Sequence, residues 1–371
     1  MKTHFLRRLL CGYFSFCACF AFAQTDFSKI DDQARQIEFS KKQNIAQLAT
    51  ALTASLTTDT EKARAIFVWI TANIRYDAKL IQEDDVEPEV FKAKQRPLEV
   101  LRSKRAVCEG YANLFTAICQ SAGLKSLVVT GLTKTRSGRI PKIGHAWNVV
   151  RVEDDWKLID ATWGSGSLDE DNKYVPEFNE KYFFSEPKTL VLNHFPSDPL
   201  FQLLEKPMDL ATFKLRTGDP APAAAANPFT IPNAKDSLDH FSTLDSSAAG
   251  LNSALRILRF DPTNSEANLS VAFCQFEAAN QSFMDYWTAQ KEMMEKQTRP
   301  TLEQLKKENE QMVQIQRGFM ACQQTIGRVP VSGRDYRSSQ TLQRAVATNL
   351  KTCQEVLEQN QKMQIRLKGK G

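Results

Sequence analysis

The chain has 371 residues, 42% of them hydrophobic and 25% charged, so it can build a sizeable core and is too apolar to be disordered. Its formal net charge is +5, and three basic residues with no acidic one lie in the leader described next, which leaves +2. Such a weak charge excludes the basic footprint of a nucleic-acid-binding protein.

Residues 1–23 have the pattern of a secretory leader. They begin with a basic segment that contains Lys2, Arg7 and Arg8. An apolar run follows over residues 9–23 and ends in the small-x-small site Ala21-Phe22-Ala23. The pattern predicts cleavage before Gln24 and export to the periplasm or the extracellular space. The run is too short to span a membrane, so no integral segment is expected after leader removal. A lipoprotein anchor at Cys19 is disfavoured by Phe16 and Cys17 upstream.

The first part of the mature chain is predicted to be helical. Residues 24–57 carry apolar residues at helical spacing. Thr58 and Glu61 then form a capping box, which predicts the start of a second helical stretch. One buried stripe follows it, made of Ala63, Ile66, Phe67, Ile70 and Ile74. Residues 81–97 are polar and acidic and predict a loop.

The stretch RAVCEGYANLFTAICQSAGL, residues 105–124, places Cys108 at the start of a predicted helix that ends at Gly123. The first backbone N–H groups of a helix have no partner within it, and their partial positive charge favours a thiolate over a thiol. A helix start is therefore a favourable place for a nucleophilic cysteine, although such a cysteine is more often a packing residue.

An antiparallel sheet is predicted after this helix. Residues 126–134, 145–152 and 155–163 read as strands, and Glu153-Asp154 reads as a tight hairpin turn. Helices first and an antiparallel sheet second indicate an α+β fold.

Beyond the sheet, residues 215–234 are a Pro/Ala-rich linker and residues 235–371 a helical C-terminal domain. Residues 247–279 resemble one tetratricopeptide-type helix pair, and residues 301–326 predict an amphipathic helix. A helical bundle is favoured over a repeat array, because one copy of a repeat is weak evidence.

Five cysteines remain after leader removal: Cys108, Cys119, Cys274, Cys322 and Cys353. Their number is odd, their spacing is wide and no CxxC occurs, so neither a disulfide framework nor a zinc site is predicted. Cys119 lies among apolar residues of the same helix as Cys108 and reads as a buried small hydrophobe.

The hairpin gives Cys108 possible partners. With a two-residue turn, Val152 faces Asp155, so His145 and Asp160 share one sheet face as diagonal neighbours that side chains can bridge. A three-residue turn would place them on opposite faces. The predicted hairpin thus permits an Asp–His hydrogen bond that orients the imidazole toward a thiol.

Each of these residues also has an ordinary structural explanation, as a packing cysteine, a core histidine or a turn aspartate. Four neighbouring candidates receive weaker predictions. Trp147 packs beside the histidine or shapes a substrate cleft, and Tyr76 is a candidate hydrogen-bond donor in that cleft. His194 is predicted to be structural and His240 to lie at the surface.

Three motifs resemble those of the transglutaminase-like superfamily of papain-type cysteine enzymes: AVCEGYANLFTAICQSAGL, GHAWNVV and WKLIDATWG. The resemblance implies Cys108 as nucleophile, His145 as base and Asp160 as the residue that orients it. KARAIFVWITANIRYDAK and residues 182–213 resemble the branch related to kyphoscoliosis peptidase. The resemblance covers about residues 58–214 and implies a papain-like core, with the cysteine-headed helix packed on the sheet and the all-α domain outside it.

The family implies acyl transfer at peptide or isopeptide amides through a thioester, by a peptidase or a transglutaminase. The alternative is a non-catalytic scaffold of the same fold that binds protein or cell-wall peptide, with the C-terminal helices as the partner surface. No cofactor is implied, and a metal enzyme is disfavoured because no two histidines have ligand spacing. Beside the backbone N–H of Cys108, the sequence identifies no second donor for an oxyanion.

Overall fold

The computed structural model describes residues 26–40, 42–83, 86–135, 137–215, 228–330 and 336–368. The predicted leader lies outside the described residues, as does most of the predicted linker. Among the described residues, no helix combines the length and the hydropathy that a membrane crossing requires.

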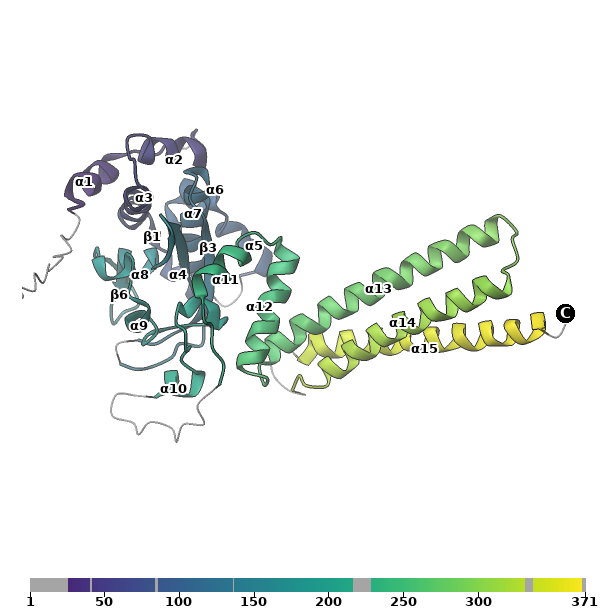
Figure 1. Cartoon of the computed structure of the whole chain (residues 1–371). Helices are drawn as coiled ribbons and strands as arrows, with labels where there is room; N and C mark the ends of the chain where they lie inside the picture. The colour runs from purple at the N-terminus through teal and green to yellow at the C-terminus, as the bar shows by residue number, and fades with distance from the viewer. Residues whose placement is uncertain are drawn as a thin grey trace, which may run out of the picture.

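Seven helices of the described chain precede the main sheet. They are α1 (Ser28–Gln36), α2 (Ile45–Thr53), α3 (Asp59–Asn73), α4 (Ala78–Gln82), α5 (Pro88–Lys94), α6 (Pro97–Ser103) and α7 (Cys108–Ser121). Of these, α1, α2, α3, α6 and α7 pack together at the top of the core in Figure 1. Thr58 and Glu61 form the expected capping box at α3, with reciprocal bonds of 3.1 and 3.0 Å. Helix α3 is buried on more than the predicted stripe, because every residue from Ala63 to Thr71 is buried.

The prediction of a loop over residues 81–97 was wrong in part. Helix α5 occupies Pro88–Lys94, and α6 begins at Pro97. Each proline stands at the first helical position, where its missing N–H costs nothing. The polar composition of α5 reflects its exposure, since none of its residues is buried.

The main sheet has four antiparallel strands in the order β5-β4-β3-β8. Their bounds are β3 (Ser126–Thr133), β4 (His145–Val152), β5 (Asp155–Ile159) and β8 (His194–Pro196). Val152 pairs with Asp155, so the two-residue turn and its register are confirmed. The strand predicted over 155–163 was too long, because it ends at Ile159 and Asp160 instead caps the short helix α8 (Ala161–Ser165).

Short elements complete this α+β core. Two are the parallel strands β1 (Arg75–Tyr76) and β2 (Arg105–Ala106), which pair with each other. The others are β6 (Gly166–Leu168), β7 (Tyr174–Pro176), η1 (Glu180–Tyr182), α9 (Pro187–Leu190), η2 (Pro199–Gln202) and α10 (Leu210–Lys214).

The two faces of the sheet have different covers. On one face, Asn148 donates from Nδ2 to the carbonyl of Ala112 in α7, at 3.1 Å, so the cysteine-headed helix packs on the sheet as expected. On the other face, Trp147 and Leu158 pack with Leu200 of η2 and Leu238 of α11 (Ala234–Phe241). Ile231, inside the predicted linker, is also buried there.

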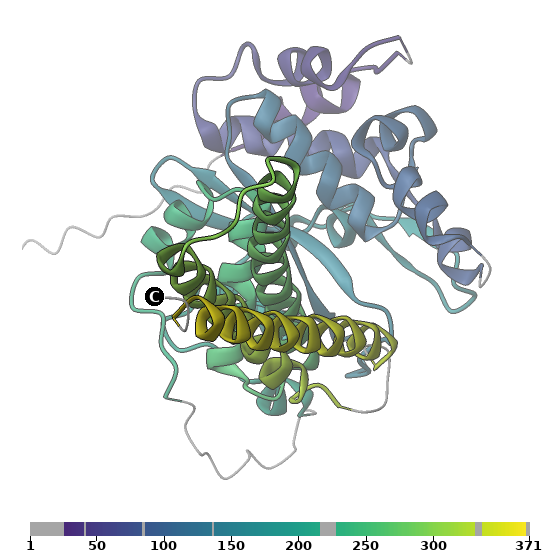
Figure 2. The ribbon, with the colours of Figure 1, turned by 90° about the vertical axis from the view of Figure 1, so that its right-hand side faces the viewer.

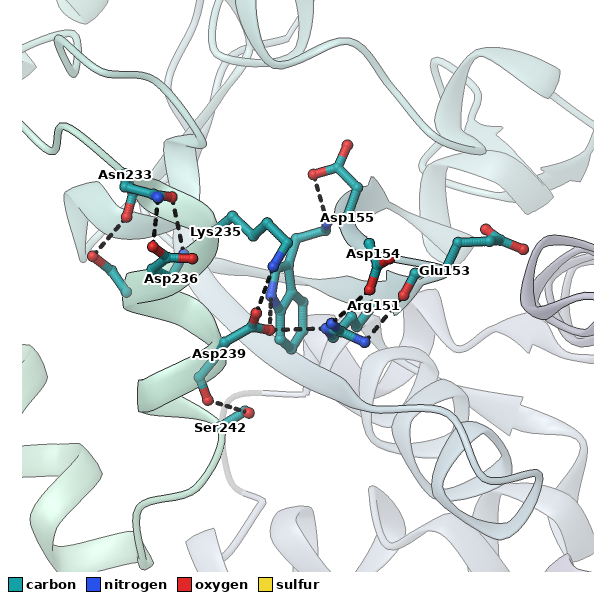
Figure 3. A network of polar contacts seen from close by, with 11 residues as sticks. Arg151, Glu153, Asp154, Asp155, Asn233, Lys235, Asp236, Asp239 and Ser242 are labelled. Atoms are coloured by element: carbon teal, nitrogen blue, oxygen red, sulfur yellow. Dashed lines mark hydrogen bonds and ion pairs between the residues drawn. The ribbon is translucent and has the colours of Figure 1, made fainter.

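Polar contacts fix α11 to the sheet (Figure 3). Oδ1 of Asp239 accepts hydrogen bonds from Nε of Arg151 at 2.9 Å and from the indole N–H of Trp156 at 3.0 Å. Oδ2 of the same carboxylate accepts from Lys235 at 2.9 Å. The C-terminal part of the chain is therefore attached to the core by its first helix.

Helix α12 (Ser246–Phe260) is held by a second carboxylate. Asp198, just after β8, accepts two bonds from Arg256, at 2.7 and 2.6 Å, and one from Ser253 at 2.7 Å. Asp198 is only 4% exposed. This bidentate pair joins the start of the helical region to the edge of the sheet.

Three long helices then project from the core as an arm, α13 (Ser265–Glu295), α14 (Leu302–Ile326) and α15 (Tyr336–Lys368) (Figures 1 and 2). The predicted amphipathic helix over 301–326 is confirmed as α14. Its apolar face packs with α13 and α15 in one cluster that includes Phe283, Phe319 and Cys353. The arm is thus a small helical bundle, the arrangement that the sequence favoured over a repeat array.

Candidate active site

Cys108 is the first residue of α7 and is 9% exposed. No side chain caps the start of this helix, so the backbone N–H groups of its first turn have no side-chain hydrogen-bond partner. The preceding residue, Val107, is extended and donates its N–H to Oε1 of Gln95 at 3.1 Å. A Cβ at Gly110 would lie 2.5 Å from the same Oε1, which explains the glycine two residues after the cysteine.

The paired strands β4 and β5 place His145 beside Asp160. His145 is the first residue of β4, and Asp160 follows the last residue of β5 in the confirmed register. Nε2 of His145 lies 2.8 Å from Oδ2 of Asp160. Nδ1 is the remaining ring nitrogen, and the Cys108 thiol lies close enough to the ring for the imidazole to lower its pKa. Cys108 also packs with Ala146, the residue after His145. The structure therefore brings the three residues together.

The Asp160 carboxylate is completely buried and fully hydrogen-bonded. Oδ1 accepts from the backbone N–H groups of Thr162 at 2.8 Å and Trp163 at 3.0 Å, at the start of α8. Oδ2 accepts from His145 and, at 2.9 Å, from Nε2 of His194. Burial opposes the charge of this carboxylate, but the two histidines outweigh burial and hold its pKa well below the usual range.

His194 was missed as a site residue by the sequence prediction, which gave it a structural role. It is 1% exposed and lies in β8, on the far side of β3 from His145. The hydrogen bond to Asp160 makes it part of the site's polar network. The only signal in the sequence was a histidine in the segment NHFPSDP, whose strand is too short to show an alternating pattern.

The electrostatics favour a charged thiol–imidazole pair. Burial raises the pKa of the Cys108 thiol, but the hydrogen bond and charge of His145 lower it further than burial raises it, so the net shift is downward. Burial lowers the pKa of His145, but the Asp160 charge outweighs burial and raises it to about 10. Both shifts stabilise thiolate and imidazolium together.

Aromatic rings surround the imidazoles. Trp147 is 1% exposed and stacks on His145 with ring centroids 5.9 Å apart, so it packs beside the histidine. Trp163 packs against His194 with centroids 4.5 Å apart. Tyr76 is partly buried, and burial and the nearby charges of Cys108 and Asp160 raise its pKa. Tyr76 pairs with Ala106, two residues before Cys108.

One cluster of the described residues has the spacing of metal ligands, namely His145, Asp160 and His194, whose ligand atoms lie within 4.8 Å of one another. These atoms already pair in two hydrogen bonds to one carboxylate oxygen, and all three residues are buried. We therefore interpret the cluster as a hydrogen-bond network. His240 does not join it and is exposed on α11, and Cys119 is fully buried in α7.

Comparison with known proteins identifies the core. Residues 46–161 match the family model of the transglutaminase-like superfamily. The chain carries a transglutaminase-like domain. Kyphoscoliosis peptidase of Homo sapiens is 36% identical over 194 residues, which cover 51% of this chain and 28% of that protein. The resemblance inferred from the sequence is therefore confirmed.

Two further proteins share similarity with the transglutaminase-like domain. Lim and transglutaminase domain protein ltd-1 of Caenorhabditis elegans is 27% identical over 205 residues, 51% of this chain and 27% of that protein. A solved structure of a TGase is 18% identical, covers 42% of this chain and 35% of its own, and has a TM-score of 0.27. The chain thus spans about a quarter of the length of the curated relatives named here.

Proposed function

We propose that the protein is a cysteine enzyme of the transglutaminase-like class that acts on peptide or isopeptide amides. The observation that carries this proposal is the hydrogen bond of His145 to the buried Asp160 carboxylate, made by an imidazole that also lowers the pKa of the Cys108 thiol. A scaffold has no need for a thiol whose pKa is lowered inside a buried site. The name of the human relative, a peptidase, supports the same reaction class.

The reaction follows from the roles of the three side chains. The Cys108 thiolate attacks the amide carbonyl carbon, and the C–N bond breaks as His145 gives its proton to the departing nitrogen. The product is a thioester on Sγ. His145 then takes a proton from water or from an amine, which attacks the same carbon and releases the thiol. Asp160 holds the imidazole ring in orientation and stabilises its charged form.

The start of α7 supplies part of the stabilisation of the oxyanion. Its uncapped N–H groups and the partial positive charge of the helix end lie where negative charge develops on the carbonyl oxygen. We assign Tyr76 to the substrate cleft, because the Cys108 charge raises its pKa and the two groups therefore lie close. Water gives hydrolysis and an amine gives cross-linking, so the substrate partner is a protein or peptide in either case.

The proposal is tested by the rate of Cys108 alkylation by iodoacetamide from pH 5 to 9. Wild-type protein and His145→Ala are compared, and peptide mass mapping separates Cys108 from the other thiols. We expect fast labelling below neutral pH that the His145→Ala variant loses. A slow rate that rises only near the ordinary thiol pKa of about 8.5, in both proteins, would rule out the enzyme.

A product assay separates the two chemistries. A glutamine-containing protein is supplied with a labelled primary amine, and both amine incorporation and newly formed free amines are measured. Incorporation that depends on Cys108 indicates a transglutaminase, whereas new amino termini without incorporation indicate a peptidase.

We also propose that the protein is exported after cleavage before Gln24. The support is the leader pattern in the sequence, with its basic start and apolar run. N-terminal sequencing of protein recovered from the periplasm or medium tests it. A chain that keeps residues 1–23 and stays inside the cell would contradict it.

A scaffold role remains the second candidate, with the arm as its partner surface. It is favoured by apolar side chains exposed on the arm, among them Met294 at 71% and Ile365 at 64%. A Cys108→Ala protein that still performs the native role would support the scaffold and contradict the enzyme.

A further inference from the structure

His194 hydrogen-bonds to the same oxygen of the Asp160 carboxylate as His145 does. Its Nε2 lies 2.9 Å from Oδ2 of Asp160, and Nε2 of His145 lies 2.8 Å from that oxygen. His194 also lies beyond residue 161, where the match to the family model ends. The site therefore contains a fourth polar side chain beside the thiol, imidazole and carboxylate, and it comes from a different segment of the chain.

The backbone fixes the place of His194. Gly131 of β3 pairs with His145 on one side, and Thr133, two residues later, pairs with His194 on the other. Residues two apart in a strand share a face, so both histidines point to the same side of the sheet. Nδ1 of His194 lies 2.6 Å from Oδ1 of Asn193, and Nε2 is directed at Oδ2 of Asp160.

The chemistry of a buried carboxylate explains what this contact does. His145 must change its charge and its hydrogen bonding during each turnover. If His145 were the only hydrogen-bond partner of Oδ2, the position of that oxygen would be set by the same imidazole ring that the oxygen has to orient. The other titratable groups packed on His194 are Asp160, His145 and Tyr182, the last at a ring distance of 6.0 Å. Only His194 and His145 donate to Oδ2 among the bonds of the described residues.

We propose that His194 is a positioning residue: its Nε2–H holds Oδ2 of Asp160 in place, so that the carboxylate keeps His145 aimed at Cys108. This inference rests on the proposed function. It makes no claim of contact between His194 and substrate. Burial lowers the pKa of His194 despite the Asp160 charge.

A matched pair of variants tests the role. Gln and Met have nearly the same shape and volume, but only Gln offers an N–H to Asp160. His194→Gln and His194→Met are therefore compared by the pH dependence of Cys108 alkylation, with folding checked by thermal unfolding. We expect His194→Gln to stay within about threefold of wild type. We expect His194→Met to move the acid side of the profile up by about one pH unit, or about tenfold in rate near pH 6.

The outcomes separate the two proposals. Slow, His145-independent labelling of wild type would remove the proposed function and this inference with it. Fast labelling of wild type with the same profile in both His194 variants would overturn the inference alone and leave the enzyme. A merely structural role would lower the unfolding temperature of both variants and would not distinguish Gln from Met in the pH profile.

A second measurement needs no substitution and applies if either variant fails to fold. Wild-type protein labelled with 15N-histidine is followed by long-range proton–nitrogen NMR from pH 5 to 9. We expect Nε2 of His194 to carry a proton throughout, since it donates to an ionised carboxylate. An unprotonated Nε2 would overturn the inference.

Discussion

The core and the arm bury the same functional group with opposite results. Cys322 and Cys353 of the arm are 0% exposed, and burial raises the pKa of each thiol to about 11. Cys108 of the core is also buried, at 9%, yet its pKa is lowered because His145 outweighs burial. Burial alone therefore makes an inert thiol, and an imidazole held by a carboxylate makes a nucleophile.

The difference comes from where each region finds its partners. The arm is formed by three helices that follow one another along the chain, and Cys322 donates its S–H to a neighbouring helix carbonyl, that of Ala272, at 3.1 Å. The site in the core combines a helix start, two strands and β8. Only long-range pairing can place a carboxylate and two imidazoles beside one thiol.

The largest effect is expected from removing the Cys108 thiol. Cys108→Ala should lower amide turnover by at least about 10³-fold, because the covalent route is lost. Cys322→Ala, the matched control in the arm, should keep activity near wild type. The measurement is the initial rate on a substrate found in the product assay. Equal loss in both variants would mean that the two thiols do not differ as described.

Removing the charge of Asp160 should come next. Asp160→Asn keeps an oxygen that can cap α8, but it no longer stabilises the His145 cation, so the pKa of His145 falls and that of Cys108 rises. Turnover near neutral pH should fall about 10²–10³-fold. The alkylation profile of Cys108 should move toward that of an ordinary thiol.

Acid unfolding checks the same carboxylate. The folded-state pKa of Asp160 is lowered, so its stabilising contribution is complete above the unfolded value of about 3.9 and is lost as pH falls below it. Wild type should therefore lose stability more steeply than Asp160→Asn below about pH 4, as measured by unfolding midpoints in urea. Parallel acid curves would contradict the lowered pKa.

The connection between the two regions should yield a smaller loss, in stability. Asp198→Asn leaves Arg256 without its bidentate carboxylate partner. We expect a cost of about 2–3 kcal/mol, below the range for fully buried pairs because Arg256 keeps some exposure. Thermal unfolding and the rate of proteolysis at α12 report it. Asp154→Asn, which breaks the exposed pair with Arg151, is the control and should change little.

The smallest effect is expected from the arm thiols. Cys322→Ala with Cys353→Ala should cost about 1–2 kcal/mol at pH 7 through lost packing, with activity unchanged. Because the folded-state pKa of each thiol is raised, the thiols make their full contribution to stability below about pH 8.5. That contribution is lost as pH rises toward about 11. The difference between wild type and this variant should therefore shrink above pH 8.5. A constant difference up to pH 11 would argue against buried, neutral thiols.

Local signals in the sequence predicted a large part of the fold and of the site's geometry. The register of the β4–β5 hairpin follows from alternation and a two-residue turn, and it is confirmed, as is the start of α7 at Cys108. The reactive roles of Cys108, His145 and Asp160 stay predictions until the thiol chemistry is measured.

The misses have physical reasons. The end of β5 was misplaced because Asp160 turns its side chain to the backbone of α8, a local bond that competes with strand extension. His194 was missed because its place depends on β8 joining the outer edge of β3. A three-residue strand carries no alternation, and its partner is set by tertiary contacts.

The position of β8 also has a consequence for the order in which the proposed site is assembled. During synthesis Cys108 and α7 emerge long before His194, and long-range strand pairing is slow compared with helix formation. Until β8 pairs with β3, the carboxylate that orients the imidazole lacks one of its donors. We therefore expect the nascent chain to carry a less activated thiol, with the proposed reactivity of Cys108 complete only once the sheet has formed.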